Sequence, residues 1–233
     1  MSHPIRLSEA TRLDRRVFLS GMTGALSLLG LRAADAPPSR TRPPVRDMAA
    51  LEKLIASMAN EGPPWLAVPP AEGRLLKLMA GAVRAHRALE IGTAHGYAAM
   101  WLAAGLEETG GRLITIEILA ERVVLARRHV EAAGLNPLVT FKEGDAHKIL
   151  ATLDGPFDLV YLNADKDGLP DYFRQLFPNK LSSSALLVVY GAIKQREKMQ
   201  SYLDMIMRRE DFTTVVVSAT LEDGFCLSLR RSG

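Results

Sequence analysis

A polar loop with the sequence NADKD follows an apolar run, FDLVYL, at residues 157–162. An apolar run of this length between polar residues predicts a buried strand. The loop offers an amide, carboxylates and an amine, which are groups that bind cations or move protons. Lys166 is a candidate general base if burial lowers its pKa, and Asp165 is a second candidate. In the alternative interpretation, Lys166 only pairs with Asp165 or Asp167, and the loop leads into a helix at Pro170.

The elements that position this loop follow an alternating pattern, which predicts a mainly parallel sheet with helices on both faces. Only the sequence ATLED separates the last two apolar runs, so these must pair antiparallel as a hairpin. The sequence therefore predicts an α/β fold with a seven-stranded, mostly parallel sheet. The expected strands are 87–92, 112–117, 139–144, 157–162, 185–190, 212–218 and 224–231. The expected helices are 48–58, 72–83, 97–105, 119–133, 147–153, 170–181 and 195–209, and the first two form a cover within residues 48–86.

The carboxyl ends of the predicted parallel strands should meet at one edge of the sheet. Ligands of open parallel sheets bind in the crevice outside that edge. The rule brings together the segments 92–96, 145–146, 163–166 and 190–191, with Glu117 between them. These segments are therefore the predicted binding site.

The first of these segments lies in the sequence LEIGTAHGY, which contains Gly92 and Gly96. Glycines allow backbone to approach a ligand closely. The spacing is not the G-x-G-x-x-G of dinucleotide-binding proteins, which argues against a nicotinamide-dependent oxidoreductase. Glu90, just before the loop, is a poor neighbour for a phosphate. It favours a ligand with a positively charged end, such as an amino acid.

The next two segments indicate a nucleoside. Glu117 ends the second strand, where a carboxylate can accept hydrogen bonds from both ribose hydroxyls. In the alternative interpretation it is a solvated charge at a strand end. After the third strand, Asp145 and the small residue Ala146 leave room for an adenine ring. A nucleoside that carries an amino acid in place of phosphates is S-adenosylmethionine (SAM).

Several stretches in order resemble the class I O-methyltransferases of the caffeoyl-CoA and catechol type. They are VPPAEGRLLKLM, ALEIGTAHGYAAMWLA, ITIEILAERVVLARRHVEAAGL, FKEGDA, FDLVYLNADKDGLPDYF and LEDGFCLSLRR. The resemblance covers roughly residues 48–233. It implies a Rossmann-like methyltransferase fold, SAM as cofactor and a small-molecule methyl acceptor. Dimers are common in this family, so a homodimer is possible.

The resemblance also implies roles for individual residues. Val68 would contact the cofactor through its backbone. The methionine end would lie at Glu90 and Gly92, and Ala98 replaces a frequent serine beside it. Glu117 would bind the ribose. The full predicted cofactor-binding set is Val68, Glu90, Gly92, Thr93, Gly96, Ala98, Glu117, Asp145, Ala146 and Asn163.

The metal-binding positions of this family depart from its pattern. The family usually has Asp-Ala-Asp-Lys after strand four, and its first Asp binds a divalent metal; here that position is Asn163. The family's second pair of ligands, Asp-Asn, falls on Gly191 and Ala192, which have no donor side chain. Hard divalent cations need several oxygen ligands, mostly anionic. We therefore predict no catalytic metal, and a helix from Gln195 that leaves no room for the family's loop after the Asp-Asn pair.

Two functional hypotheses remain at this point. The first is metal-independent, SAM-dependent O-methylation of a small aromatic or hydroxylated acceptor, with Lys166, Asp165 and His95 as catalytic candidates. His95 is alternatively a polar loop residue. The second is a degenerate SAM-binding protein without transferase activity.

The N-terminal 36 residues predict a signal peptide. Arg15 and Arg16 precede a short apolar run and the small residues of Ala34-Asp35-Ala36, as in twin-arginine signals. We therefore expect export to the periplasm, with residues 37–47 as a linker and 48–233 as the methyltransferase domain. In the alternative interpretation the segment is a basic tail of a cytoplasmic protein.

Charge and composition exclude other classes of protein. Loss of residues 1–36 removes five arginines and three acidic residues, which lowers the net charge from +3 to +1 and argues against nucleic-acid binding. The only apolar run in the signal is too short for a stable membrane anchor. Cys226 is the single cysteine, which excludes an internal disulfide.

Overall fold

The computed structural model describes residues 47–58, 70–218 and 223–231. The predicted signal peptide, Val68 and all of the predicted linker except Asp47 lie outside these residues. Asp47 begins the first helix, because its Oδ1 accepts the backbone N–H groups of Ala49 and Ala50. Among the described residues, no helix combines the length and the apolar character needed to cross a membrane.

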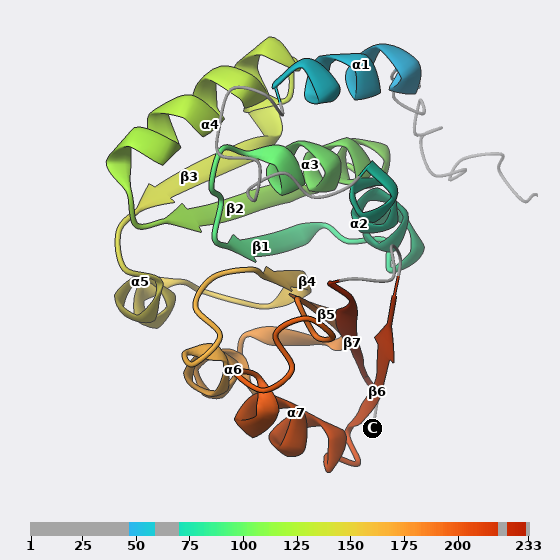
Figure 1. The fold of residues 1–233 in the computed structure, drawn as a ribbon, viewed down its shortest axis with the longest axis vertical. Coiled ribbons are helices and arrows are strands. Elements are labelled where there is room, and N and C mark those ends of the chain that lie inside the picture. Colours follow the sequence, from blue (N-terminus) through green and yellow to red (C-terminus); the bar gives the residue numbers. More distant parts are fainter. Residues whose placement is uncertain (1–46, 59–69, 219–222, 232–233) are drawn as a thin grey trace, which may run out of the picture. The chain divides into compact units, whose positions relative to one another are not determined.

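Seven strands form one sheet in the order β3-β2-β1-β4-β5-β7-β6 (Figure 1). All neighbouring strands are parallel except β7, which pairs antiparallel with both β5 and β6. The strand order reverses between β1 and β4, where open α/β sheets place their ligand crevice. The predicted sheet and hairpin are confirmed. The strands are β1 (Arg87–Ile91), β2 (Arg112–Glu117), β3 (Val139–Glu143), β4 (Phe157–Leu162), β5 (Leu181–Tyr190), β6 (Phe212–Val217) and β7 (Phe225–Arg230).

Helices cover both faces of the sheet because its central strands are apolar on both faces. Along β4, Leu159 and Tyr161 enter one apolar cluster, and Val160 and Leu162 enter another. Residues of α1–α4 belong to the first cluster and residues of α5–α7 to the second. The helices are α1 (Met48–Met58), α2 (Pro70–Ala82), α3 (Tyr97–Thr109), α4 (Ala120–Ala132), α5 (Ala146–Thr152), α6 (Leu169–Leu176) and α7 (Gln200–Met207), with a short 3₁₀ turn, η3 (Asn136–Leu138).

Two predicted helices differ from the structure. The helix expected to run to residue 181 ends at Leu176, because Pro178 disfavours a helical conformation at the residue before it. The helix expected from Gln195 begins at Gln200, and residues 191–199 form turns. The backbone N–H groups of residues 191–194 donate to the carbonyls of Asp223 and Gly224 instead of starting a helix. The prediction that a helix follows Gly191 within four residues was therefore wrong.

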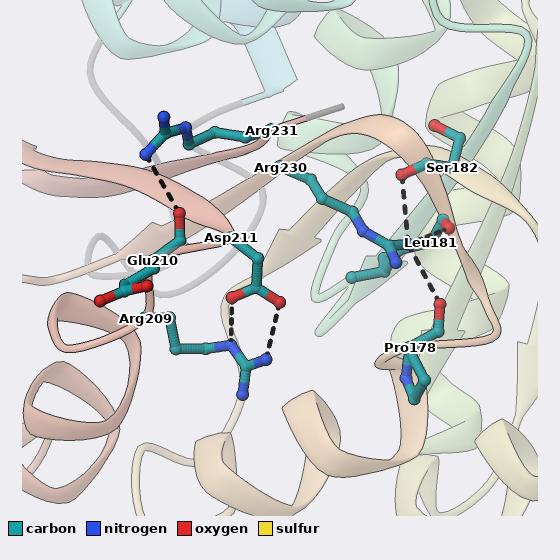
Figure 2. A network of polar contacts seen from close by, with 8 residues as sticks. All are labelled: Pro178, Leu181, Ser182, Arg209, Glu210, Asp211, Arg230 and Arg231. Atoms are coloured by element: carbon teal, nitrogen blue, oxygen red, sulfur yellow. Dashed lines mark hydrogen bonds and ion pairs between the residues drawn. The ribbon is translucent and has the colours of Figure 1, made fainter. Parts of the chain in front are cut away.

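Two arginines attach the C-terminal hairpin to the rest of the sheet (Figure 2). Arg230 donates from Nη1 to the carbonyl oxygens of Leu181 and Pro178, at 2.6 and 3.1 Å. Arg209 donates from Nε and Nη2 to both carboxylate oxygens of Asp211, at 2.8 and 2.7 Å. The Arg209 guanidinium also lies 4.2 Å from the centre of the Phe177 ring. This planar group therefore joins the start of β6 to the end of α6.

We predict that Arg209→Lys lowers the free energy of unfolding by about 1 kcal/mol, because lysine keeps the charge but loses the paired hydrogen bonds and the stacking. Denaturant unfolding measures this difference. Arg208→Lys, at an exposed neighbouring position, is the matched control and should stay within about 0.5 kcal/mol of the parent. Equal stabilities of the two variants would contradict the prediction.

Candidate functional site

A cavity of about 670 Å³ opens at the carboxyl ends of β1, β2 and β4. This is the edge of the sheet at which the sequence predicted a crevice. Its volume suits a ligand of nucleoside size. Predicted cofactor residues that line it are Gly92, Glu117, Asp145, Ala146 and Asn163.

Gly92 permits the close approach of two strand ends. Its φ is +95°, and a Cβ there would lie 2.3 Å from the backbone oxygen of Asn163. The N–H of Gly92 and that of Thr93 both donate to the carbonyl of Ile116. Gly96, with φ +89°, similarly packs against Ala126 of α4. Both glycines are thus required by contacts within the protein, and not only by a ligand.

Glu117 is held rigidly in the cavity wall. Its Oε2 accepts the N–H of Ala94 at 2.9 Å, and its Oε1 accepts the N–H of Leu119 at 3.1 Å. The side chain is 5% exposed, and Arg122 lies 3.9 Å away. A carboxylate has about four lone-pair positions, so each oxygen can accept a further hydrogen bond. This fixed geometry fits two neighbouring ribose hydroxyls.

Glu90 is a fully buried carboxyl group beside the cavity-lining residue Ile91. Its Oε2 accepts the hydroxyl of Thr115 at 2.6 Å, and Thr115 also bonds the hydroxyl of Thr93. Its Oε1 has no hydrogen-bond partner among the described residues. Burial is the main reason that the pKa of Glu90 rises to about 8. This Oε1 oxygen can therefore still accept a hydrogen bond. Ala98, 6% exposed, lies in the first turn of α3, and its side chain offers no hydrogen bond.

On the predicted adenine side, Asp145 caps α5 by accepting the N–H of His147 at 2.9 Å. The His147 ring stacks on Tyr172 with centroids 4.3 Å apart, and its Nδ1 lies 2.5 Å from Asp171 Oδ2. Burial alone would lower the pKa of His147, but the bond to Asp171 and the nearby carboxylates raise it. His147 and Tyr172 both line the cavity, and sequence reasoning identified neither of them.

Asp165 belongs to the same group of contacts. Its Oδ1 accepts the hydroxyl of Tyr172, and its Oδ2 lies 3.8 Å from His147 Nε2. The carboxylate is therefore engaged on the α5–α6 side of the cavity. This geometry does not favour Asp165 as a catalytic base.

His95 does not line the cavity. It is 2% exposed, and its ring lies edge-on to that of His129 of α4, with centroids 6.2 Å apart. Burial, followed by His129 and Arg122, lowers the pKa of His95. His95 was a catalytic candidate near the crevice, and its buried position away from the cavity wall does not favour that role. The alternative, a polar loop residue, agrees with its place in a turn, although the ring is buried.

Lys166 is buried, with 6% of its surface exposed, although it is not itself part of the cavity wall. Its Nζ donates to Asn163 Oδ1 at 3.4 Å and lies 6.0 Å from the centre of the Tyr190 ring. Burial lowers the pKa of Lys166 to about 8, and the carboxylates of Asp165 and Asp223 offset part of that effect. The ammonium group therefore loses its proton near physiological pH.

Gly191 has no side chain and therefore leaves space beside the buried Lys166 side chain. With φ +90°, a Cβ there would lie 3.4 Å from Lys166 Cε and 3.1 Å from Gln195 Nε2. The two side chains therefore approach the space into which a side chain at 191 would extend. We call Asn163, Lys166, Tyr190, Gly191 and Gln195 the Lys166 corner.

The Lys166 corner does not fit a divalent metal. It offers amide groups and an ammonium, whereas hard cations need several anionic oxygens. Within the described ranges, no group of three or more His, Cys, Asp or Glu side chains is arranged to hold a metal ion. Metal independence itself stays a prediction.

Catechol O-methyltransferase of Niastella koreensis is 36% identical over 144 residues, which are 60% of this chain and 64% of that protein. Catechol O-methyltransferase of Mycobacterium tuberculosis is 38% identical over 131 residues, 56% of this chain and 59% of that protein. The chain thus matches about three fifths of the length of these relatives.

Among solved structures, the O-methyltransferase TomG from Streptomyces achromogenes, in complex with SAM, is 33% identical with a TM-score of 0.68. The match covers 81% of this chain and 92% of TomG. This likeness confirms the Rossmann-like methyltransferase fold. A family model described as O-methyltransferase matches residues 43–229, which is most of the chain. The chain therefore belongs to the O-methyltransferase family.

Proposed function

We propose that this protein is a SAM-dependent O-methyltransferase that acts on a small aromatic or hydroxylated acceptor without a catalytic metal. The observation that carries the proposal is Glu117, a carboxylate fixed by two backbone N–H groups in the wall of a nucleoside-sized cavity. Membership of the O-methyltransferase family supports the reaction class. When bound, SAM supplies an electrophilic methyl group.

Three parts of the chain would hold the cofactor. Glu117 would accept the ribose hydroxyls. Ala146, with its side chain limited to a methyl group, would leave space for the adenine. The buried Glu90 would take the ammonium of the methionine end, which would supply the partner missing at its Oε1.

The residues of the Lys166 corner would deprotonate the hydroxyl group of the methyl acceptor. A buried lysine whose pKa lies near 8 is partly neutral at physiological pH, so it can accept the proton of an acceptor hydroxyl. The same side chain, once protonated, stabilises the resulting oxygen anion. Positioning of the two reactants contributes the rest of the acceleration.

We expect Glu117→Gln to weaken the binding of S-adenosylhomocysteine about 10- to 100-fold, because the neutral amide accepts hydrogen bonds less strongly and also presents a donor. Isothermal titration calorimetry measures the affinity. Glu121→Gln, on the exposed side of α4, is the control and should bind as the parent does. If the parent protein binds no S-adenosylhomocysteine, the proposed function is wrong.

Methyl transfer should continue in excess EDTA, because the Lys166 corner offers no anionic oxygens for a divalent ion. The measurement is the initial rate with a phenol panel, with EDTA and then with added Mg²⁺. Activity that EDTA removes and Mg²⁺ restores would overturn the metal-independent part of the proposal. Binding of the cofactor without any transfer would favour the degenerate alternative.

For an acceptor that binds as the neutral phenol, the rate of transfer at saturating acceptor should rise with pH through about 8, as Lys166 loses its proton and becomes a base. Lys166→Met should remove this rise and lower kcat about 100-fold or more, because no base remains at that position. Its affinity for S-adenosylhomocysteine should stay within about twofold of the parent. A variant that keeps both the rate and the pH profile would exclude Lys166 as the base.

A further inference from the structure

We propose that the Lys166 corner binds the acceptor as an oxygen anion, and that the acceptor is a phenol with a single acidic hydroxyl group. Two neighbouring hydroxyls would not be required. This inference rests on the proposed function and deepens it by naming the class of acceptor.

The packing of two side chains beside Gly191 is the first support. The Lys166 stem, at Cε, and the Gln195 amide, at Nε2, lie 3.4 and 3.1 Å from one point, the Cβ position that Gly191 leaves open. Gln195 also lines the cavity, together with Asn163 and Tyr190. An ammonium has three N–H donors, of which Asn163 Oδ1 accepts one at a long distance of 3.4 Å. The lysine can therefore donate to a further oxygen.

Two nearby carboxylates, Asp165 and Asp223, act on Lys166 electrostatically, and each also has another partner. Asp165, which lines the cavity, accepts the hydroxyl of Tyr172. Asp223 forms an ion pair of 3.5 Å with Lys194, a residue whose side chain is 61% exposed. The Lys166 corner itself contributes one cation and amide groups, with Asp165 and Asp223 outside it. This set complements one anionic oxygen, and the corner lacks the anionic ligands that would hold a divalent ion for a second acceptor oxygen.

The acceptor should be acidic because a lysine ammonium lowers the pKa of a neighbouring hydroxyl less than a metal ion does. An ordinary phenol has a pKa of about 10 and keeps its proton at neutral pH. A bound divalent cation lowers the pKa of its ligands strongly, whereas a single ammonium lowers that of a neighbour by about 1–3 units. Phenols with electron-withdrawing substituents, which ionise near neutral pH, are therefore the preferred class.

The transfer step balances for such an acceptor. A lone pair of the phenolate oxygen forms the new bond to the methyl carbon, while the electron pair of the carbon–sulfur bond returns to sulfur. The anion becomes a neutral ether and the sulfonium becomes a neutral thioether. Lys166 keeps its proton throughout; where the phenol binds in neutral form, its proton moves first to the neutral amine of Lys166.

The test uses the absorbance of 4-nitrophenol, which distinguishes the phenol from the phenolate without any turnover. The full-length protein is saturated with S-adenosylhomocysteine in EDTA, and bound 4-nitrophenol is titrated with pH. We expect its pKa to fall by about 1–3 units on binding. Lys166→Met should abolish the shift, Gln195→Leu should reduce it, and Lys198→Met, at an exposed lysine, should leave it unchanged.

Calorimetry with S-adenosylhomocysteine separates the possible failures. If the protein binds that ligand but leaves the pKa of 4-nitrophenol unchanged, the present inference is wrong and the proposed function stands. If Lys166→Met does not fold, the pKa shift of bound 4-nitrophenol is compared between Gln195→Leu and the parent. An equal shift in the two proteins would overturn the role of Gln195. In EDTA with SAM, methyl transfer to 4-nitrophenol should exceed transfer to catechol at least tenfold, and the reverse order would also contradict the proposal.

Discussion

The contact between Gly92 and the backbone of Asn163 is the constraint on which the whole site depends. It occurs where the strand order reverses between β1 and β4, and any Cβ at position 92 would lie 2.3 Å from the Asn163 oxygen. Because the same turn also donates two N–H groups to Ile116, the ends of β1, β2 and β4 are held in one arrangement. The glycine loop, Glu117 and the polar loop after β4 therefore face a common cavity.

Glu90 and Lys166 are two of the ionisable groups buried in the described part of the chain, and burial shifts their pKa values in opposite directions. The carboxyl of Glu90 has its pKa raised to about 8, and the amine of Lys166 has its pKa lowered to about 8. Each group is thus moved towards its neutral form, as desolvation requires. Charged ligands can reverse this effect: a cation next to Glu90 favours its carboxylate, and an anion next to Lys166 favours its ammonium. This agrees with the proposed pair of ligands, of which one carries a positive and the other a negative group.

Sequence reasoning located most of the fold because the strands are strongly apolar. The expected bounds of β2 and β4 agree with the structure, as does the antiparallel hairpin. The start of α7 was predicted too early, since residues 191–199 form turns. The N–H groups of residues 191–194 bond to Asp223 and Gly224, a tertiary contact that no local pattern reveals. The pair of His147 and Tyr172 was missed for a similar reason, since 25 residues separate its members along the chain. For His95, a loop sequence alone did not tell whether the ring points to the cavity or to α4.

The packing of the Lys166 corner also bears on the choice between a metal-independent methyltransferase and a degenerate SAM-binding protein. Loss of metal ligands alone would leave space at Gly191. Instead, Lys166 and Gln195 approach that space, and Ala192 beside it is fully buried. The positive φ of Gly191 further suits a residue without a side chain, so the backbone and the packing agree with each other. Burial disfavours the charged form of Lys166, and the packing around the side chain keeps it buried. The packing at Gly191 therefore agrees with the proposed metal-independent site, in which the lysine of the family's Asp-Ala-Asp-Lys pattern is retained as Lys166.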